Sequence, residues 1–332
     1  MRFSLKPGTY ILVGAEDFIY VIGKSAKLKI RIPVKYRQRV VRLLVSGTSV
    51  ASLSRATDAV SAKTLYDMLQ AKSLIRAVCP AAKEGTSLEK TEIYFSQYCD
   101  SPVIGLERLA SAHVAVVGLG GIGCVLVEQL VACGVKNFTC IDFDRVSITN
   151  LNRQFCFTPE SVGRRKTYEI KKYIMSRSSQ AKVSLVDSKI TSLPKFSSIM
   201  AKAHTIPPVN FVACCADLPR NRINSIITAY CLEKDLPCSF CGVGIYDGIF
   251  GPLLRSGDEK RRYLGFLDDA EGAKMFPAVT SGSIGFTNSL IAILFAKDIA
   301  MSIAGVPEFK SRAAIVNVDF DDLSAATVKS FR

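Results

Sequence analysis

Alternating apolar and polar positions near the start of the chain predict three short β-strands. The alternation runs over residues 9–13, 18–22 and 27–32, and Gly14 and Gly23 separate the three runs. In the last run every second residue is a cation, namely Lys27, Lys29 and Arg31. A strand with one charged and one apolar face is half-buried, and it is typical of the edge of a sheet.

The apolar spacing becomes helical after Pro33, and the first helix is expected to end at Gly47. A short second helix contains Leu53. A third helix covers residues 62–72, and Ser61 is expected to be its N-cap. Three strands followed by three helices predict a small winged-helix-like domain.

A strand, a glycine-rich turn, a helix and a second strand follow one another further along the chain. Residues 114–117 form a buried strand, and the second strand ends in Asp142-Phe-Asp144. The turn between the first strand and the helix contains Gly118, Gly120, Gly121 and Gly123. Glycines allow close backbone approach, the helix N-terminus favours phosphate, and the acid accepts hydrogen bonds from ribose hydroxyls. This unit predicts a Rossmann-like, mostly parallel α/β sheet with a nucleotide site.

Proline, glycine, serine and several charged residues between positions 79 and 100 suit a linker. We therefore expect a first domain at residues 1–80, a linker at 81–105 and a second domain at 106–332. No internal repeat or low-complexity tract is found in the sequence.

The composition suits a folded protein with reduced thiols. Of its 332 residues 48% are hydrophobic, which excludes intrinsic disorder and removes the need for disulfide bonds. Its 11 cysteines are scattered, several of them in apolar runs, as in cytoplasmic proteins. The N-terminus lacks the long apolar segment of a signal peptide, and residues 114–135 and 290–296 make no convincing membrane span. We expect a cytoplasmic protein without a membrane partner.

The chain is basic, with 43 Lys and Arg against 29 Asp and Glu and a formal net charge of +14. Such a charge suits nucleic acid, an anionic surface, or an acidic or phosphate-bearing substrate. Because the excess is spread along the chain and tryptophan is absent, we expect no nucleic-acid partner.

Residues beyond the second strand indicate which nucleotide would bind. Asn150, Arg153 and Lys166 follow it, and a later apolar strand ends at Asp217. A triphosphate needs such cations and a metal-holding acid, whereas a nicotinamide enzyme does not. Simpler interpretations remain open for each residue: a strand-end turn for Asp142 or Asp144, solvated helix charges for Arg153 and Lys166, and an N-cap near Pro219 for Asp217.

Taken together, these motifs resemble the ThiF/MoeB/ubiquitin-activating family of adenylating enzymes over about residues 106–303. Five motifs occur in the family's order: Gly118–Gly123, Asp142-Phe-Asp144, Asn150-Leu-Asn-Arg-Gln154, Gly163–Lys166 and the strand end at Asp217. The resemblance implies binding of ATP and magnesium, with Asp142 as the acid on the ribose and Asp144 as a further nucleotide-binding residue. It implies that Asn150, Arg153 and Lys166 contact the triphosphate and that Asp217 holds the magnesium, so that Arg153, Lys166 and Asp217 are the catalytic groups.

The family's reaction makes a carboxylate reactive. The carboxylate attacks the α-phosphorus of ATP, pyrophosphate leaves, and an acyl adenylate forms. Two anions must first be brought together, and fixed cations with a metal ion neutralise them.

Two features of the family are missing from the sequence. Its structural zinc usually needs two Cys-x-x-Cys pairs, whereas this chain has one, Cys238 to Cys241, and no later cysteine. One pair cannot close a tetrahedral site, so we expect no zinc. Residues 258–280, where some relatives carry a transfer cysteine, contain none, so a thioester step is not expected.

The first domain resembles the PqqD-like recognition element of enzymes that modify ribosomally made peptides, over residues 8–78. In that element a leader peptide adds as a strand beside the third strand, and an edge strand suits this. A winged helix for DNA binding or dimerisation remains the alternative.

The combination of both domains resembles the peptide-modifying branch of the family, represented by PaaA and MccB, and the missing cysteines favour the PaaA type. This resemblance implies a homodimer and a precursor peptide with a leader. A carboxylate of that peptide, expected to be a glutamate side chain, is adenylated and captured by a backbone amide with loss of water, which closes a ring. Candidate contacts to an acidic substrate are Lys27, Lys29 and Arg31, and the loop residues Lys260, Arg261 and Arg262.

Three other functions stay open. The first alternative is adenylation of the C-terminal carboxylate of a peptide or of a sulfur-carrier or ubiquitin-like protein. An NAD-dependent oxidoreductase would bind nicotinamide and release no pyrophosphate. A winged-helix regulator would bind DNA and would not turn over substrate.

Overall fold

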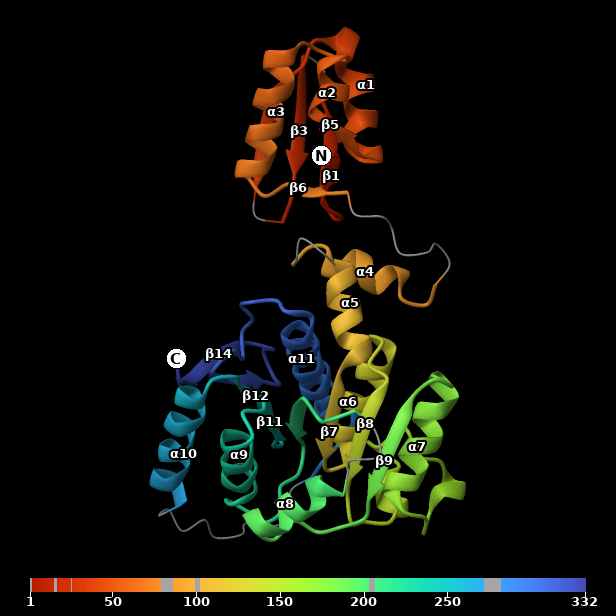
Figure 1. Ribbon diagram of the computed structural model, residues 1–332, viewed down its shortest axis with the longest axis vertical. Coiled ribbons are helices and arrows are strands. Elements are labelled where there is room, and N and C mark those ends of the chain that lie inside the picture. The colour runs from red at the N-terminus through yellow and green to blue at the C-terminus, as the bar shows by residue number, and fades with distance from the viewer. Residues whose placement is uncertain are drawn as a thin grey trace. The chain divides into compact units, whose positions relative to one another are not determined.

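The computed structural model describes residues 2–14, 17–24, 26–78, 86–98, 102–202, 207–271 and 282–332. The chain divides into two units, residues 1–105 and 106–332 (Figure 1). The segment predicted as a linker contains helix α4 (Glu89–Phe95), and helix α5 (Pro102–Ser111) crosses the division. Residues 81–85 and 99–101 of that segment lie outside the described residues.

The first unit contains the three predicted strands. They are β2 (Tyr10–Val13), β3 (Phe18–Ile22) and β4 (Lys27–Arg31), paired antiparallel in the order β2-β3-β4. A second small sheet, in the order β5-β1-β6, was not predicted, and it consists of β1 (Arg2–Leu5), β5 (Thr48–Ser49) and β6 (Ile75–Ala77). Its strands come from three distant segments and are too short to show a pattern of their own.

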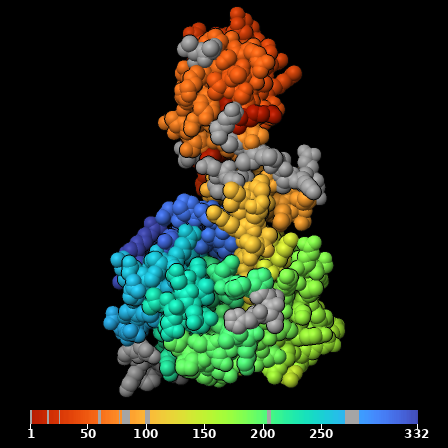
Figure 2. All heavy atoms as spheres, viewed as in Figure 1, coloured from red at the N-terminus to blue at the C-terminus, as the bar shows by residue number. Residues whose placement is uncertain are grey.

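Three helices of this unit pack with these strands: α1 (Val34–Ser46), α2 (Val50–Ser54) and α3 (Ala59–Ala71). The predicted cap of α3 is wrong, because Asp58 is the N-cap and its carboxylate accepts the N–H of Ser61 at 2.7 Å. Ile19 and Val21 of β3 are fully buried in a core shared with α1, α2 and α3. In the space-filling view the strands and helices up to β6, red to orange, form one closely packed body (Figure 2).

The second unit is built on an eight-stranded sheet in the order β14-β13-β12-β11-β10-β7-β8-β9. Its strands are β7 (His113–Val117), β8 (Asn137–Ile141), β9 (Lys182–Val186), β10 (Phe211–Cys214), β11 (Cys238–Val243), β12 (Asp247–Leu254), β13 (Ala314–Asp319) and β14 (Ala325–Ser330). The five strands from β9 to β11 are parallel, and β12 to β14 extend the sheet antiparallel. The predicted Rossmann-like, mostly parallel sheet is confirmed.

Helices cover both faces of this sheet (Figure 1). They are α6 (Gly121–Ala132), α7 (Lys166–Arg177), α8 (Leu193–Ala201), α9 (Ile223–Glu233), α10 (Gly257–Glu271) and α11 (Gly285–Ala304). α6 packs against α7 and α11, and α9 packs against α8 and α10. The chain runs from β7 outward to β9 and then returns to β10 on the other side of β7. The carboxyl ends of β7 and β10 therefore form a topological switch point, where ligands bind in sheets of this kind.

Among the described residues α11 is the one helix long and apolar enough to cross a membrane. Half of its apolar stretch is buried inside the protein, where it packs against α6 and β12. This is the environment of a core helix, and it agrees with the expectation that residues 290–296 form no membrane span.

Candidate functional site

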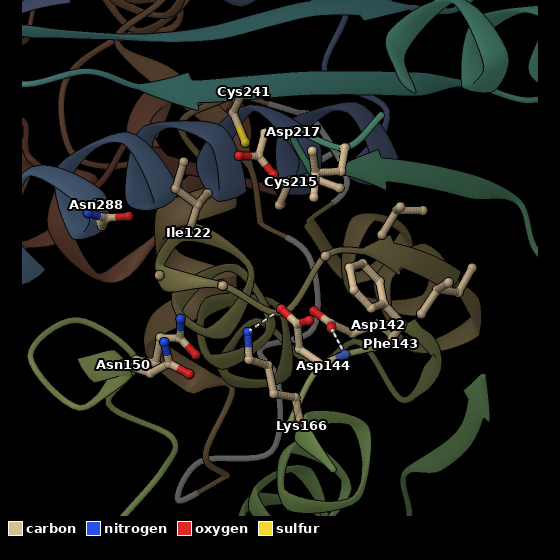
Figure 3. Close-up of a pocket in the computed structure, with 18 of the residues that line it drawn as sticks. Ile122, Asp142, Phe143, Asp144, Asn150, Lys166, Cys215, Asp217, Cys241 and Asn288 are labelled. Carbon is tan, nitrogen blue, oxygen red and sulfur yellow. Dashed lines mark hydrogen bonds and ion pairs between the residues drawn. The ribbon is translucent and has the colours of Figure 1, made fainter. Parts of the chain in front are cut away.

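A cavity of about 370 Å³ opens at the carboxyl ends of β7, β8, β10 and β11 in the second unit (Figure 3). The residues predicted for the nucleotide, the metal and catalysis come together here, and all of them except Gly123 line it. They are Gly118, Gly120, Gly121, Asp142, Asp144, Asn150, Arg153, Lys166 and Asp217. Parallel strands end at one edge of a sheet, and this brings residues a hundred positions apart into one cavity.

The glycines of the turn serve two different purposes. Gly118 has φ +89°, and a Cβ there would lie 2.9 Å from the backbone nitrogen of Ala216. A Cβ on Gly123 would overlap the carbonyl oxygen of Gly118. Gly120, in contrast, has no described atom within 4 Å of its Cβ position, and it precedes the N-terminus of α6, which the described side chains leave uncapped. The space beside Gly120 is suited to an anion.

This difference predicts that one substitution affects nucleotide binding and another affects the stability of the fold. Gly120→Val is expected to keep the melting temperature and to weaken ATP binding roughly tenfold, because its side chain fills the space at the helix N-terminus. Gly123→Ala is expected to lower the free energy of unfolding by about 1–3 kcal/mol, because the methyl group meets backbone. Thermal unfolding and titration with a fluorescent ATP analogue measure both. Wild-type nucleotide affinity in Gly120→Val would refute the assignment of that space.

Asp142 is buried, and both of its carboxylate oxygens are engaged with backbone. Oδ2 accepts the N–H of Leu119 at 2.7 Å, and Oδ1 accepts the N–H of Asp144 at 2.8 Å. Asp142 therefore fastens the glycine turn to the end of β8, which agrees with its simpler interpretation as a strand-end residue. Asp144 is the acid that remains accessible, since 48% of its side chain is exposed.

Lys166 is the first residue of α7 and is only 5% exposed. Its ammonium lies 3.1 Å from Oδ2 of Asp144, and its backbone N–H donates to the Asp144 carbonyl at 3.2 Å. Its interpretation as a solvated helix charge is therefore wrong. A buried ammonium that lines a cavity is a strong electrostatic partner for an anion, because water screens it little.

Arg153, Asn150 and Gln154 come from one loop segment that begins with the short helix η1 (Ile148–Asn150). Nη1 of Arg153 donates to the Thr149 carbonyl and to Oδ1 of Asn152, both at 2.8 Å. Oδ1 of Asn150 accepts the N–H of Ser147 at 3.0 Å. These bonds hold the arginine and the asparagine in fixed positions at the cavity.

Gln154 is a site residue that sequence reasoning missed. It lines the cavity and is 2% exposed, and its Oε1 has no hydrogen-bond partner among the described residues. Leaving such an atom unpaired costs free energy, so a ligand or water is expected to donate to it. Its signal was available, because it is the last residue of the motif that begins at Asn150.

Asp217 follows the end of β10, and it lines the cavity together with Cys215 and Cys241 (Figure 3). Its carboxylate is exposed and forms no hydrogen bond or ion pair within the described part of the chain. Because α9 begins at Ile223 after Arg222, Asp217 is not its N-cap, and that interpretation is wrong.

A single free carboxylate fits magnesium, which takes one or two protein carboxylates and completes its shell with phosphates and water. In the described ranges no three His, Cys, Asp or Glu side chains are grouped to hold a metal by themselves. Any magnesium on Asp217 would thus depend on the nucleotide for its remaining ligands.

The thiols of the Cys-x-x-Cys sequence lie in different environments. Cys238 is fully buried and is hydrogen-bonded to Cys231, a thiol outside the Cys-x-x-Cys sequence. Burial and this hydrogen bond raise the pKa of Cys231. Cys241 lines the cavity, and burial with a hydrogen bond to Cys215 raises its pKa. A β-bulge between Ser239 and Cys241 shifts the register of β11 against β12. The two thiols do not form one metal-binding pair.

The prediction for Lys260, Arg261 and Arg262 is wrong in its structural part. These residues lie on α10 and not in a loop, and they are absent from the lining of the cavity. Lys260 is fully buried, and its ammonium donates to the Arg255 carbonyl at 3.0 Å. Arg261 pairs with Asp258 on the same helix. Arg262 donates to the carbonyl of Arg332. These bonds are structural.

A comparison with known families identifies the second unit. Residues 94–331 match the sequence model of the ThiF family, which is more than half of the chain. The chain belongs to the ThiF family. Among curated relatives, SUMO-activating enzyme subunit 2 of Dictyostelium discoideum is 31% identical over 147 residues, covering 43% of this chain and 20% of the relative. Ubiquitin-like modifier-activating enzyme 5 of Drosophila willistoni is 31% identical over 159 residues, covering 46% of this chain and 38% of the relative. This ThiF chain thus matches less than half the length of these relatives.

Solved structures share the fold over the entire chain. A crystal structure of E. coli MccB with AMPCPP and MccA has a TM-score of 0.80 at 20% identity, covering 100% of this chain and 98% of MccB. A crystal structure of PaaA has a TM-score of 0.72 at 17% identity, covering 98% of this chain and 100% of PaaA. The predicted resemblance to the PaaA and MccB branch of the ThiF family is confirmed at the level of the fold.

Proposed function

We propose that this protein is an ATP-dependent enzyme that adenylates a carboxylate of a ribosomally made precursor peptide. One observation carries the proposal: a buried ammonium (Lys166), a fixed guanidinium (Arg153), a free carboxylate (Asp217) and an open helix N-terminus line one cavity. Membership of the ThiF family and the fold shared with MccB and PaaA support it.

Different parts of the cavity suit different parts of the nucleotide. The open space at Gly120 and the amides of α6 suit phosphate oxygens. The accessible carboxylate of Asp144, rather than that of Asp142, suits the ribose hydroxyls, because Asp142 already accepts two backbone bonds. Arg153, Lys166 and the amide of Asn150 suit the triphosphate.

The reaction needs two negatively charged groups to meet. A carboxylate oxygen of the peptide attacks the α-phosphorus, the bond to pyrophosphate breaks, and a mixed anhydride with AMP forms. Lys166 and Arg153 lower the repulsion between the anions and stabilise the charge on the leaving pyrophosphate. Magnesium held by Asp217 would add positive charge at the phosphates.

The first unit is suited to bind the peptide. β4 has a strand neighbour on one side only within the described residues, and Lys27, Lys29 and Arg31 on it are exposed. An edge strand of this kind takes up an extended peptide through backbone hydrogen bonds. The structures of MccB with MccA support a peptide as the substrate.

Three finer parts belong to this proposal. The activated group is a glutamate side chain. A backbone amide nitrogen attacks the acyl adenylate and loses its proton, AMP leaves, and a ring closes, so that the peptide has lost one water overall. The enzyme works as a homodimer in the cytoplasm. It acts without zinc and without a transfer cysteine, in agreement with its single Cys-x-x-Cys pair.

A second function has support of its own. Curated relatives are activating enzymes for ubiquitin-like modifiers, and this suggests adenylation of the C-terminal carboxylate of a small protein or peptide.

Exchange of labelled pyrophosphate into ATP distinguishes these functions. We expect exchange to depend on magnesium and on a precursor peptide that carries a leader and an internal glutamate. Glutamate→glutamine in that peptide should abolish exchange, whereas amidation of its C-terminus should not. The reverse result would favour the second function. If no peptide and no small protein supported exchange, adenylation would be refuted.

A further inference from the structure

The edge of β4 that has no strand neighbour among the described residues presents backbone groups of three particular residues. Ile32, just beyond β4, donates its N–H to the carbonyl of Asp17, just before β3, at 2.6 Å. Ile32 and Asp17 therefore form a hydrogen-bonded pair of the ladder. Hydrogen-bonded and non-bonded pairs alternate along an antiparallel ladder, so Leu28 and Ile30 also bond to β3. The residues between them direct their N–H and C=O groups to the open edge; they are Lys27, Lys29 and Arg31.

The same three residues carry the positive charges, because side chains alternate between the two faces of a strand. Leu28 and Ile30 turn inward and pack on the core of the unit. The three cations are exposed on the outer face in a row, about 6.7 Å apart along the strand. Free backbone groups and cations thus occur at identical positions.

The present partners of these cations are weak. The Lys29 ammonium lies 4.1 Å from the ring centroid of Phe18, and that of Lys27 lies 5.3 Å from the ring of Tyr20. Arg31 is 3.8 Å from the Asp17 carboxylate, with 76% of the arginine side chain exposed. Exposed contacts of this kind contribute little free energy, so carboxylates of a bound strand can replace them.

From this arrangement we infer a sequence rule for the peptide: the segment that binds β4 has acidic residues at every second position, three in all, with apolar residues between them. A strand added in register places its residues opposite Lys27, Lys29 and Arg31 on the same face, at cross-strand distance, whichever direction it runs. The residues between them fall on the face of Leu28 and Ile30, which is apolar. The inference rests on the proposed function, since it names the partner of that function's recognition strand.

The opposite edge of the sheet does not compete for such a segment. β2 has the sequence Tyr-Ile-Leu-Val and contains no charged residue. An acidic strand placed beside it would gain no opposite charge. The selectivity therefore belongs to β4.

Fluorescence anisotropy with the full-length protein tests the rule. The probes are labelled seven-residue peptides: one alternates three glutamates with four valines, a second has the same composition with the glutamates adjacent, and a third alternates three lysines with four valines. Three opposite-charge cross-strand pairs predict that the first probe binds about tenfold more tightly than the second, with weaker binding at high salt. Equal binding of the first two probes would overturn the rule.

Charge reversal tests the assignment to β4. The triple variant Lys27→Glu, Lys29→Glu, Arg31→Glu should prefer the lysine probe over the glutamate probe. If the triple variant does not fold, Lys29→Gln takes its place. It removes one charge without reversing it, and it should weaken binding of the glutamate probe by a few fold. Arg39→Glu on α1 is the matched control, because Arg39 is exposed and lies outside the sheet. An unchanged preference in both β4 variants would overturn the assignment.

Binding and catalysis are measured separately, so that their failures are distinguishable. Probe selectivity without pyrophosphate exchange for any peptide would remove the proposed function and leave the rule for β4 in place. Exchange with a precursor peptide, but without probe selectivity, would remove the rule alone. Displacement of the glutamate probe by a short oligonucleotide would also count against a peptide at this edge.

Discussion

Asp217→Ala and Asp217→Asn are both expected to lower the rate of pyrophosphate exchange by about a hundredfold or more. Asp217 is the one acid of the cavity that is exposed and has no hydrogen bond or ion pair among the described residues. Asn keeps the shape of the side chain and removes the charge, so equal losses in the two variants would show that the charge matters. The folded state should survive, because the side chain makes no bond within the described structure.

The metal dependence of exchange gives a second readout. If Asp217 holds magnesium, the residual activity of Asp217→Asn should need a higher magnesium concentration, whereas ATP binding without magnesium should change little. Asp321→Ala is a suitable control, since Asp321 is also exposed and does not line the cavity. Wild-type exchange in Asp217→Ala would show that this carboxylate does not hold the metal.

Much of the site could be predicted from the sequence because its residues are next to strand ends. The runs at 114–117 and 211–214 are apolar throughout, and each is followed by a turn that carries glycine or acid. Parallel strands end at one edge of a sheet, so a residue just after each strand reaches the same cavity. Local sequence therefore carried information about long-range proximity.

The roles of the two acids after β8 could not be separated in the same way. Asp142 and Asp144 are two positions apart, so they point to the same side of an extended chain. Only the return of the glycine turn places the N–H of Leu119 against Asp142 and leaves Asp144 open. That choice depends on a contact 23 residues away in the chain.

Lys260 shows a different limit. Three consecutive cations suggested a solvated loop, yet Lys260 is fully buried and bonded to a carbonyl. The sequence did contain a local signal for the helix, a capping box. The N–H of Ser256 donates to the Glu259 carboxylate at 3.0 Å, and the N–H of Glu259 donates to Oγ of Ser256 at 3.2 Å. The burial of one lysine out of three, in contrast, follows from packing that no local pattern encodes.

Lys166→Met is expected to reduce kcat/KM for pyrophosphate exchange by about a hundredfold, an effect comparable to that of Asp217→Ala. Methionine fills the volume of the buried stem but supplies no charge. The variant would also leave the Asp144 carboxylate, now 3.1 Å from the ammonium, without its ion pair. ATP binding should therefore weaken along with catalysis.

A second substitution separates these two effects. Adding Asp144→Asn to Lys166→Met removes the unpaired carboxylate, yet exchange should stay low, because the cation on the phosphates is still missing. Lys171→Met on the same helix is the control, since Lys171 is exposed and does not line the cavity. If the double variant regained exchange, Lys166 would act only as the partner of Asp144, and the positive charge needed to bring two anions together would have to come from Arg153 and the metal.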